Sequence, residues 1–502
     1  MLPANNSYDA IVVGAGLGGL SAGATLARAG KRVLIVERND GPGGNAHAFK
    51  RGPYTFDPAV HVTAHGFNVQ FLNLYLESLG LADGLELVLL DEIFGADICG
   101  SRFVLPTGVG RLTEYLSGRF PAHSDAIARF IETCAQATLE SQAPPPRVAL
   151  RDLEAAMSAL PTLFKYRNAT LAEGIAEFIT DPELSSVLSA QWPYMGLPPS
   201  QASFMACTSA FMAYADPGPV YVRGSFQKLA DALAAVVLDR GGEISYGVTV
   251  SKIFVDGGRV TGVGSADGSQ ARAPVVVSNA DARLTFEKLV GLEHLPQAFV
   301  RRLNRMRPSI SGFLVYSACK LPLHEMGLSS ELLVHDNWDH EATWANVLAG
   351  RPGGTWLSIP TLIDPSLAPE GEHLMIFSSL MPYEINEPWA DARGRIAEEM
   401  VERIEALVPG YRESITFIDN ATPETFERYT LAHKGALYGW ANFPQQTLPK
   451  RLNHQTPLEG LILAGHWTNP GTGSLRCLLS GLQAASIVEG QHDPVAFLAT
   501  LR

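Results

Sequence analysis

A glycine-rich loop near the start of the chain constrains the fold more than any other feature. Residues 8–13, YDAIVV, form a short apolar run rich in β-branched residues, typical of a buried parallel strand. GAGLGG at 14–19 follows directly, and residues 20–30 read as a helix that ends at a glycine. A second strand, RVLIVE, ends at Glu37. This order, with an acidic residue about 20 positions after the loop, predicts a dinucleotide-binding βαβ unit.

The residues of this unit have distinct physical roles in the prediction. Gly14 permits a tight turn, Gly16 lets backbone amides approach a pyrophosphate, and Gly19 lets the helix pack on the strand. The N-terminus of the helix offers N–H groups and partial positive charge to an anion. Glu37 can accept hydrogen bonds from a ribose. The predicted dinucleotide contacts from this unit are Gly14, Gly16, Leu17, Gly18, Gly19, Glu37 and Arg38.

The next residues indicate which dinucleotide is bound. The doublet Gly43-Gly44 after the ribose acid resembles that of FAD proteins of the amine-oxidase and phytoene-desaturase type. In those proteins the loop lies against the pyrophosphate and leads toward the isoalloxazine, and residues 52–61 resemble their following hairpin. Asn45 stands where such families often carry an arginine. The resemblance implies that FAD is the cofactor and that Gly43, Gly44 and Asn45 contact it.

A second glycine-rich segment, LILAGHWTNPGTGSLRCLLSGL, begins at Leu461. It resembles the C-terminal signature of the same superfamily, in which the chain returns to complete the FAD domain. The strand 461–464 would end at the turn glycine, and the following helix would point its N-terminus at the isoalloxazine. No further βαβ unit follows, so we expect this segment to form the far wall of the first site. The implied contacts are Gly465, His466, Gly473, Ser474 and Leu475.

A middle segment also resembles the FAD proteins. Residues 220–263 are similar to the family's middle FAD segment, whose V-x-V strand, here Val248 and Val250, touches the adenine through its backbone. APVVVSNADA at 273–282 matches the strand that returns to the cofactor domain and carries Asn279. The resemblance implies an α/β fold whose Rossmann-like FAD-binding domain is built from three separated segments, with an inserted α+β substrate domain of mixed sheet plus helices. The FAD segments are 1–75, 217–290 and 455–502, and the insertions are 76–216 and 291–454.

The two insertions have different patterns. The first reads as mainly helical, with a loop predicted at 139–149 because three prolines fall at 144–146. Its apolar stretches 160–168 and 203–215 either form helix cores or line a lipophilic tunnel. The second alternates apolar and polar residues, as at 311–321 and 373–381, which predicts the strands of a substrate-domain sheet.

Few residues are candidates for chemistry. His61 and His65 have the spacing HxxxH, but no third ligand is evident and we expect no metal. His61 lies where the resembled proteins pass the flavin, so it acts beside the isoalloxazine or makes a structural hydrogen bond. KGALYGW at 434–440 is similar to a stretch near the flavin in saturase-like members. That likeness makes Tyr438 and Trp440 candidates for the substrate cavity, although both could simply be packing aromatics.

Charge and composition limit the partners. The net charge of −13 argues against nucleic acid, and no apolar run approaches the roughly 20 residues of a membrane span. Five scattered cysteines without a CxxC pair indicate a reduced, cytoplasmic protein, which could contact a membrane peripherally. The sequences GVG at 262–264 and 108–110 lack the third glycine of a second nicotinamide site. We therefore expect an external electron acceptor or donor, such as oxygen, a quinone or a protein.

The resemblance points to the group that holds phytoene desaturase, carotenoid cis–trans isomerase and retinol saturase. Three activities are compatible with it. An FAD-dependent oxidoreductase would desaturate or saturate a carbon–carbon bond of an apolar, isoprenoid or polyene substrate by hydride transfer at flavin N5. An isomerase would use reduced FAD without net oxidation. A flavin oxidase of a small secondary metabolite or amine is the third, and the apolar insertions argue against it because an amine cation needs an acidic or aromatic cage. A non-enzymatic, FAD-stabilised partner protein is the remaining alternative.

Overall fold

The computed structural model describes residues 1–3, 7–67, 70–142 and 153–501. The loop predicted at 139–149 falls mostly on residues 143–152, which lie outside the described residues. Residues 139–142 belong to the last turn of helix α4 (Ser124–Gln142), so the prediction of a loop is wrong for them. The physical reason is that the first proline of the run stands at Pro144, beyond the helix.

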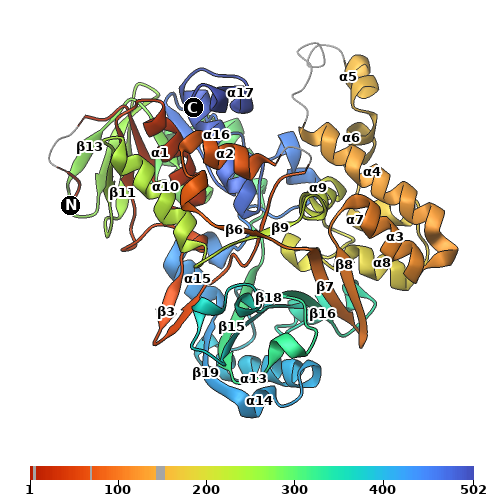
Figure 1. Ribbon diagram of the computed structural model, residues 1–502. Helices are drawn as coiled ribbons and strands as arrows, with labels where there is room; N and C mark the ends of the chain where they lie inside the picture. The colour runs from red at the N-terminus through yellow and green to blue at the C-terminus, as the bar shows by residue number, and fades with distance from the viewer. Residues whose placement is uncertain (4–6, 68–69, 143–152, 502) are drawn as a thin grey trace.

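A five-stranded parallel sheet forms the first domain, and its strands come from three distant parts of the chain. The strand order is β10-β2-β1-β14-β20, and all neighbours are parallel. In Figure 1 the red, green and blue parts of the chain meet in this domain. The predicted three-segment construction is therefore confirmed. The strands are β1 (Ala10–Val13), β2 (Val33–Val36), β10 (Glu243–Ser245), β14 (Val276–Ser278) and β20 (Leu461–Leu463).

Three helices pack with this sheet: α1 (Leu17–Arg28), α10 (Gln227–Asp239) and α16 (Ser474–Val488). Helix α1 follows Gly16 directly, and the chain turns away after it at Gly30, where φ is +85°. Helices α1 and α16 pack closely because Gly481 lacks a side chain: a Cβ there would lie 2.3 Å from the carbonyl oxygen of Gly18. The first and last segments of the chain are thus held against each other. An antiparallel sheet of β11 (Val250–Asp256), β12 (Arg259–Ser265) and β13 (Gln270–Arg272) completes this domain.

A seven-stranded mixed sheet forms the inserted domain, with the order β19-β15-β18-β17-β16-β7-β8. Both insertions contribute to it, because β7 pairs in parallel with β16. The first insertion is therefore not helical throughout: β7 and β8 extend the sheet of the second insertion, and the short strand β6 (Leu87–Leu89) pairs with β9 (Pro219–Val222). Helix α13 (Trp389–Leu407) packs its apolar face on this sheet. The strands are β7 (Glu92–Ile98), β8 (Ser101–Pro106), β15 (Ser311–Cys319), β16 (Glu331–His335), β17 (Thr355–Ser358), β18 (His373–Met381) and β19 (Ile415–Ala421).

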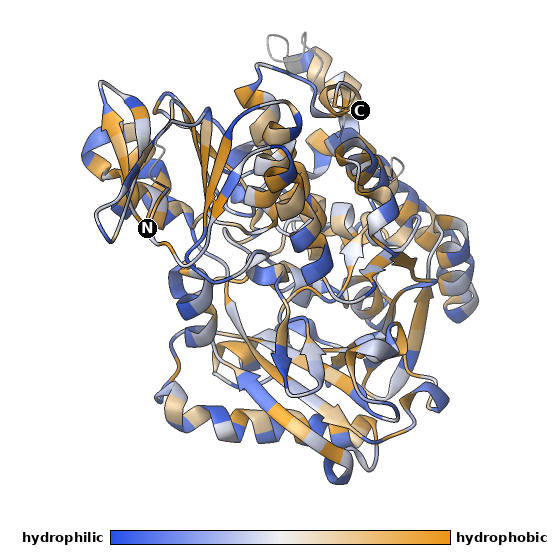
Figure 2. Ribbon diagram, turned by 60° about the vertical axis from the view of Figure 1, so that its left-hand side comes forward, coloured by the Kyte–Doolittle hydropathy of each residue, from blue (hydrophilic) through white to orange (hydrophobic). Residues whose placement is uncertain are grey.

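Within residues 109–142 and 153–215 the first insertion is mainly helical, and these helices lie beside β7 and β8 (Figure 1). Its helices are α3 (Val109–Arg119), α4, α5 (Leu153–Ala159), α6 (Pro161–Tyr166), α7 (Leu171–Ala176), α8 (Pro182–Ser189) and α9 (Phe204–Ala215). Figure 2 shows that outer helices alternate hydrophilic and hydrophobic residues, whereas the strands are mainly hydrophobic. Among the described residues, every helix is too short or too polar to cross a membrane.

Candidate functional site

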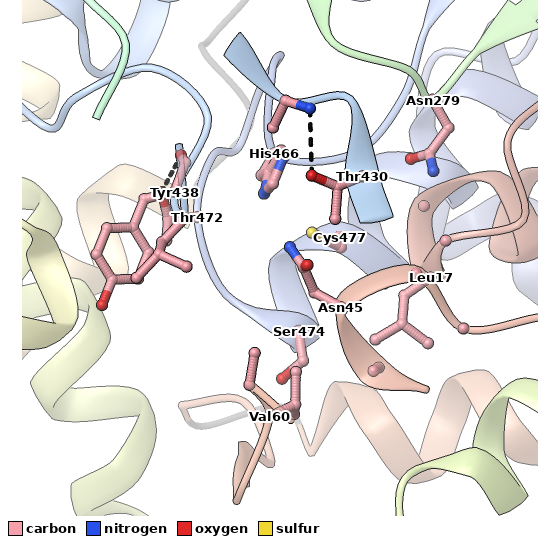
Figure 3. A pocket seen from close by; sticks show the side chains of 18 of the residues that line it. Leu17, Asn45, Val60, Asn279, Thr430, Tyr438, His466, Thr472, Ser474 and Cys477 are labelled. Atoms are coloured by element: carbon pink, nitrogen blue, oxygen red, sulfur yellow. Dashed lines mark hydrogen bonds between the residues drawn. The ribbon is translucent and has the colours of Figure 1, made fainter. Parts of the chain in front are cut away.

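One large cavity lies between the five-stranded sheet and the inserted domain, and separated parts of the chain line it. Figure 3 shows Leu17, Asn45 and Ser474 around it, with Tyr438 and Asn279 on opposite sides of the view. Most of the predicted site residues meet here. Those that line the cavity are Gly14, Gly16, Leu17, Gly18, Glu37, Arg38, Gly43, Gly44, Asn45, His61, Val250, Asn279, Tyr438, His466, Gly473, Ser474 and Leu475.

Two helices begin at the cavity wall. Gly16 is the N-cap of α1 and Gly473 is the N-cap of α16, and neither helix start receives a side-chain capping bond. The first N–H groups of a helix have no partner within the helix, so uncapped ends are available to an anion. Gly473 adopts a φ of +112°, which favours glycine at that start. The cavity thus combines two helix N-termini from opposite ends of the sequence.

The glycines around the first helix start make room for a ligand. A Cβ on Gly16 would lie 2.8 Å from the side-chain nitrogen Nδ2 of Asn279, and a Cβ on Gly44 would lie 2.9 Å from the Cα of Gly16. The N–H of Gly43 donates to the carbonyl of Ala15 at 2.8 Å. The doublet therefore packs directly on the loop after β1. Side chains at these positions would fill the cradle.

Two predicted contacts lie behind the cavity wall instead of on it. A Cβ on Gly19 would lie 2.0 Å from the carbonyl oxygen of Gly14, so this glycine allows α1 to pack on the loop. A Cβ on Gly18 would lie 2.6 Å from the Cα of Gly465, so these two glycines pack directly against each other. Both residues shape the cradle and neither lines the cavity. The packing role predicted for Gly19 is therefore seen in the structure, and direct contact of Gly19 and Gly465 with the cofactor stays a prediction.

The carboxylate of Glu37 is buried at the end of β2, and both of its oxygens accept backbone hydrogen bonds. Oε2 accepts from the N–H of Ala15 at 2.7 Å, and Oε1 accepts from the N–H of Asn39 at 2.8 Å. A carboxylate oxygen can accept more than one bond, so Glu37 retains capacity for ribose hydroxyls in the cavity. The acid therefore shapes the loop and also faces the ligand.

The inserted domain also closes the end of the cavity beside Glu37. Arg38 donates to the carbonyl of Arg428, and the side-chain amide of Asn39 donates to the carbonyl of Tyr429. These carbonyls belong to helix α15 (Pro423–Thr430), and residues 429–432 line the cavity. Sequence reasoning placed this stretch in the substrate domain alone. It was missed because the contact joins residues about 390 positions apart.

Two histidines line the cavity in neutral form. His61 is buried, and its Nε2 has no hydrogen-bond partner among the described residues. Burial lowers the pKa of His61 to about 4. The pKa of His466 is also lowered to about 4, by burial and by the nearby Arg451. Within the part of the chain that the structure describes, no group of three His, Cys, Asp or Glu residues could hold a metal ion, and His65 does not line the cavity.

The guanidinium of Arg451 is buried and joins two segments beside the cavity. It donates to the carbonyls of His466 at 2.7 Å, Trp440 at 3.1 Å, Thr468 at 3.1 Å and Tyr438 at 3.3 Å. This arginine had not been predicted, because nothing local in the sequence marks its carbonyl partners. It holds the KGALYGW stretch against the loop that precedes α16.

The two aromatic candidates in that stretch have different positions. Tyr438 lines the cavity, and its hydroxyl donates to the carbonyl of Pro193 at 2.9 Å. Trp440 does not line the cavity: its ring packs edge-to-face on Trp467 with centroids 5.0 Å apart, and it is fully buried. Gly439 between them has a φ of +67°, so the backbone turns there and residues two apart do not face the same side as they would in a strand. Trp440 is a packing residue, and the prediction that it lines a substrate cavity is corrected.

Sequence reasoning missed the cavity wall that the inserted domain contributes. Its polar and aromatic side chains come from distant elements and share no motif. Arg476, on helix α16 of the FAD-binding domain, also lines the cavity and was missed, although it stands two residues after Ser474 in the C-terminal signature. Several small and apolar residues complete the wall. The residues that the inserted domain contributes are Tyr194, Met195, Ala210, Ala213, Tyr214, Leu314, Glu331, Trp356 and Leu437. Helix α9 lies in the stretch 203–215, which was expected either to form a helix core or to line a tunnel. It packs in the core through its buried residues, and its Ala210, Ala213 and Tyr214 line the cavity.

Comparison with known proteins agrees with this geometry. The model of the family described as flavin containing amine oxidoreductase matches residues 17–488. The chain is 30% identical to the chloroplastic prolycopene isomerase of Daucus carota, over 99% of this chain and 83% of that protein. It is 24% identical to the all-trans-retinol 13,14-reductase of Danio rerio, over 93% of this chain and 85% of that protein. The fold is similar to that of wild-type putrescine oxidase bound to putrescine, with a TM-score of 0.65, 13% identity and coverage of 97% and 99%.

The cavity fits FAD on its own residues. The glycine cradle would be filled by any Cβ, the two uncapped helix N-termini suit a pyrophosphate, and Glu37 suits a ribose. The family match spans most of the chain and includes α1, the doublet Gly43-Gly44 and α16. The chain therefore belongs to the flavin containing amine oxidoreductase family, its cofactor is FAD, and it is similar to the carotenoid isomerases and retinol reductases within that family.

Proposed function

We propose that this chain uses FAD to add or remove hydrogen across a carbon–carbon bond of an apolar, isoprenoid or polyene substrate. One observation carries the proposal: a single cavity joins the dinucleotide cradle to a wall rich in small, apolar and aromatic side chains. An apolar ligand can therefore lie beside the cofactor without leaving the protein. The similarity to a retinol reductase supports the reaction class.

The residues of the chain have assigned roles in this proposal. Glu37 binds the ribose, and the N-termini of α1 and α16 hold negative charge of the cofactor. Bound FAD supplies hydride transfer at its N5 atom. His61, neutral at pH 7, and Tyr438 face the substrate and orient it, because both line the cavity. Electrons are exchanged with an external acceptor or donor, such as oxygen, a quinone or a protein, and an apolar substrate could be delivered by peripheral contact with a membrane.

A second candidate is cis–trans isomerisation of a polyene with reduced FAD and no net oxidation. The specific support is the 30% identity to prolycopene isomerase over 99% of this chain. The same cavity serves both reactions, because each needs an apolar polyene held beside the flavin. The two reactions differ in the mass of the product.

The test is turnover of prolycopene and of all-trans-retinol by the FAD-loaded protein without oxygen, with FAD oxidised in one series and reduced in the other. A product that gains or loses two hydrogen atoms supports the oxidoreductase. A product of unchanged mass and altered retention, formed only with reduced FAD, supports the isomerase. If the purified protein shows no flavin absorption even after FAD is supplied, both candidates fail.

A further inference from the structure

A carboxyl group stands in the cavity wall far from the predicted motifs. Glu331 is the first residue of β16 and is 4% exposed. The hydroxyl of Ser358 donates to its Oε1 at 2.5 Å, and the hydroxyl of Tyr194 donates to its Oε2 at 3.3 Å. Ser358 is its directly opposite partner on β17, so the sheet fixes the position of the carboxyl. Glu331 and Tyr194 both line the cavity.

This carboxyl has no cationic partner among the described residues, which is unusual for a buried acid. Burial raises the pKa of Glu331 to about 8, so the group is mainly uncharged at neutral pH. An uncharged carboxyl can donate one hydrogen bond and still accept others. The hydrogen bonds from Ser358 and Tyr194 leave the carboxyl able to form at least one further hydrogen bond. The group can therefore serve a ligand oxygen.

Aromatic rings hold the pair in place. The ring of Tyr194 packs edge-to-face on Trp356 with centroids 5.8 Å apart, and the hydroxyl of Tyr438 is bonded to the carbonyl of Pro193, the residue before Tyr194. A carboxyl beside aromatic rings could also suit an amine cation. The positive charge of a nearby arginine argues against an amine cation as the ligand. Arg476 lines the same cavity, and among the described residues no carboxylate forms an ion pair with it.

Both Glu331 and Arg476 lie near enough to Tyr214 to influence its hydroxyl. Burial raises the pKa of Tyr214, Glu331 when ionised raises it further, and Arg476 lowers it. A ligand held at Glu331 would therefore lie in the same part of the cavity as the positive charge of Arg476. A cation would be opposed there, whereas an uncharged hydroxyl or carbonyl would not. A purely hydrocarbon ligand would leave the remaining hydrogen-bonding capacity of the buried carboxyl unused.

We infer that Glu331 and Tyr194 form a polar anchor that binds an uncharged hydroxyl or carbonyl oxygen of an otherwise apolar substrate. The anchor lies in the wall that the inserted domain contributes to the cavity. This inference rests on the proposed function, because it names a feature of the substrate of the same site. The anchor should make the site prefer oxygen-bearing isoprenoids to hydrocarbons and to amines.

The experiment compares three ligands with similar isoprenoid chains: farnesol, β-farnesene and farnesylamine. Each is titrated into the FAD-loaded protein, and binding is read from the change in flavin absorption. Farnesol should bind about tenfold more tightly than β-farnesene, since one good hydrogen bond in a buried site accounts for a difference of that size. Tyr194→Phe and Glu331→Leu should each reduce this preference, and Glu331→Gln should keep part of it. Binding of β-farnesene should stay unchanged in Tyr194→Phe.

Tyr383→Phe is the matched control, because it removes a tyrosine–carboxyl hydrogen bond, to Glu427, outside the cavity. It should leave the preference intact. Equal binding of farnesol and β-farnesene by the unaltered protein overturns the anchor, as does a preference that survives in Tyr194→Phe. Tighter binding of farnesylamine than of farnesol overturns it in favour of a cation site. Tyr194→Phe keeps the ring, so it decides the question if Glu331→Leu does not fold. A protein that holds FAD and binds β-farnesene without preferring farnesol refutes the anchor but leaves the proposed function standing.

Discussion

The carboxylate of Glu37 accepts a hydrogen bond from the backbone N–H of Ala15 at 2.7 Å. The residue that follows β2 therefore fixes the shape of the loop that follows β1. A second bond, from the N–H of Asn39, holds the carboxylate in place. One acid thus organises the cradle before any ligand arrives, and it still faces the cavity.

Replacing Glu37 should weaken FAD binding. Glu37→Ala removes two charge-assisted hydrogen bonds to the backbone and the acceptor for the ribose, so we expect the Kd for FAD to rise at least about tenfold. The measurement is titration of the apoprotein with FAD, followed by flavin fluorescence. Glu243→Ala is the control, because the half-exposed carboxylate of Glu243, on the neighbouring strand β10, pairs with Arg32, which directly precedes β2. An unchanged Kd in Glu37→Ala would show that the acid does not serve the cofactor.

Glycine at position 481 should be needed for packing of α1 on α16. In Gly481→Ala the new Cβ would lie 2.3 Å from the carbonyl oxygen of Gly18, so the helices must move apart. We expect the variant to unfold at a lower temperature and to lose FAD more readily. Gly394→Ala is the matched control in helix α13, where a Cβ would meet nothing within 4 Å. It should keep or raise the stability, by up to about 1 kcal/mol. Equal melting temperatures for the two variants would contradict the packing argument.

Arg451 should contribute strongly to stability although no carboxylate pairs with it among the described residues. Arg451→Met would leave the carbonyls of His466, Trp440 and Thr468 without their donor, and each unsatisfied buried group costs about 1–3 kcal/mol. We expect a loss of several kcal/mol in the free energy of unfolding, measured by denaturant titration. Arg305→Met, at an exposed position of α11 (Gln297–Arg305), should change it little. A small effect of Arg451→Met would mean that water replaces the guanidinium.

The carboxyl of Glu331 should make the protein less stable as pH rises. Burial raises its pKa from about 4.5 to about 8, so between these values the native protein keeps a proton that the unfolded chain releases. Stability then falls as pH rises through that window, by on the order of a few kcal/mol. Glu331→Gln removes this dependence. The difference in melting temperature between this variant and the unaltered protein should therefore shift in favour of the variant from about pH 5 to about pH 8. A difference that is constant with pH would show that Glu331 is ionised in the native protein.

The nucleotide-binding half of this protein could be predicted from its amino-acid sequence. The GAGLGG loop, Glu37, the doublet Gly43-Gly44 and the segment after Leu461 are local signals, because each role depends on backbone conformation or on a residue at a strand end. These signals predicted the three-segment domain and most of the cavity lining around the cofactor. The structure contains the three-segment sheet and places those residues at the cavity.

The cavity wall beyond the cofactor cradle could not be predicted from the sequence, because it forms only when distant elements pack together. Glu331, Tyr194, Tyr214 and Arg476 lie on separate elements, and as isolated residues they cannot be told from ordinary surface or core side chains. Tyr438 and Trp440 show the same limit within one short stretch: the first faces the cavity and the second packs behind it. The inward direction of a side chain depends on packing between distant segments. A local sequence pattern therefore does not predict which way such a side chain points.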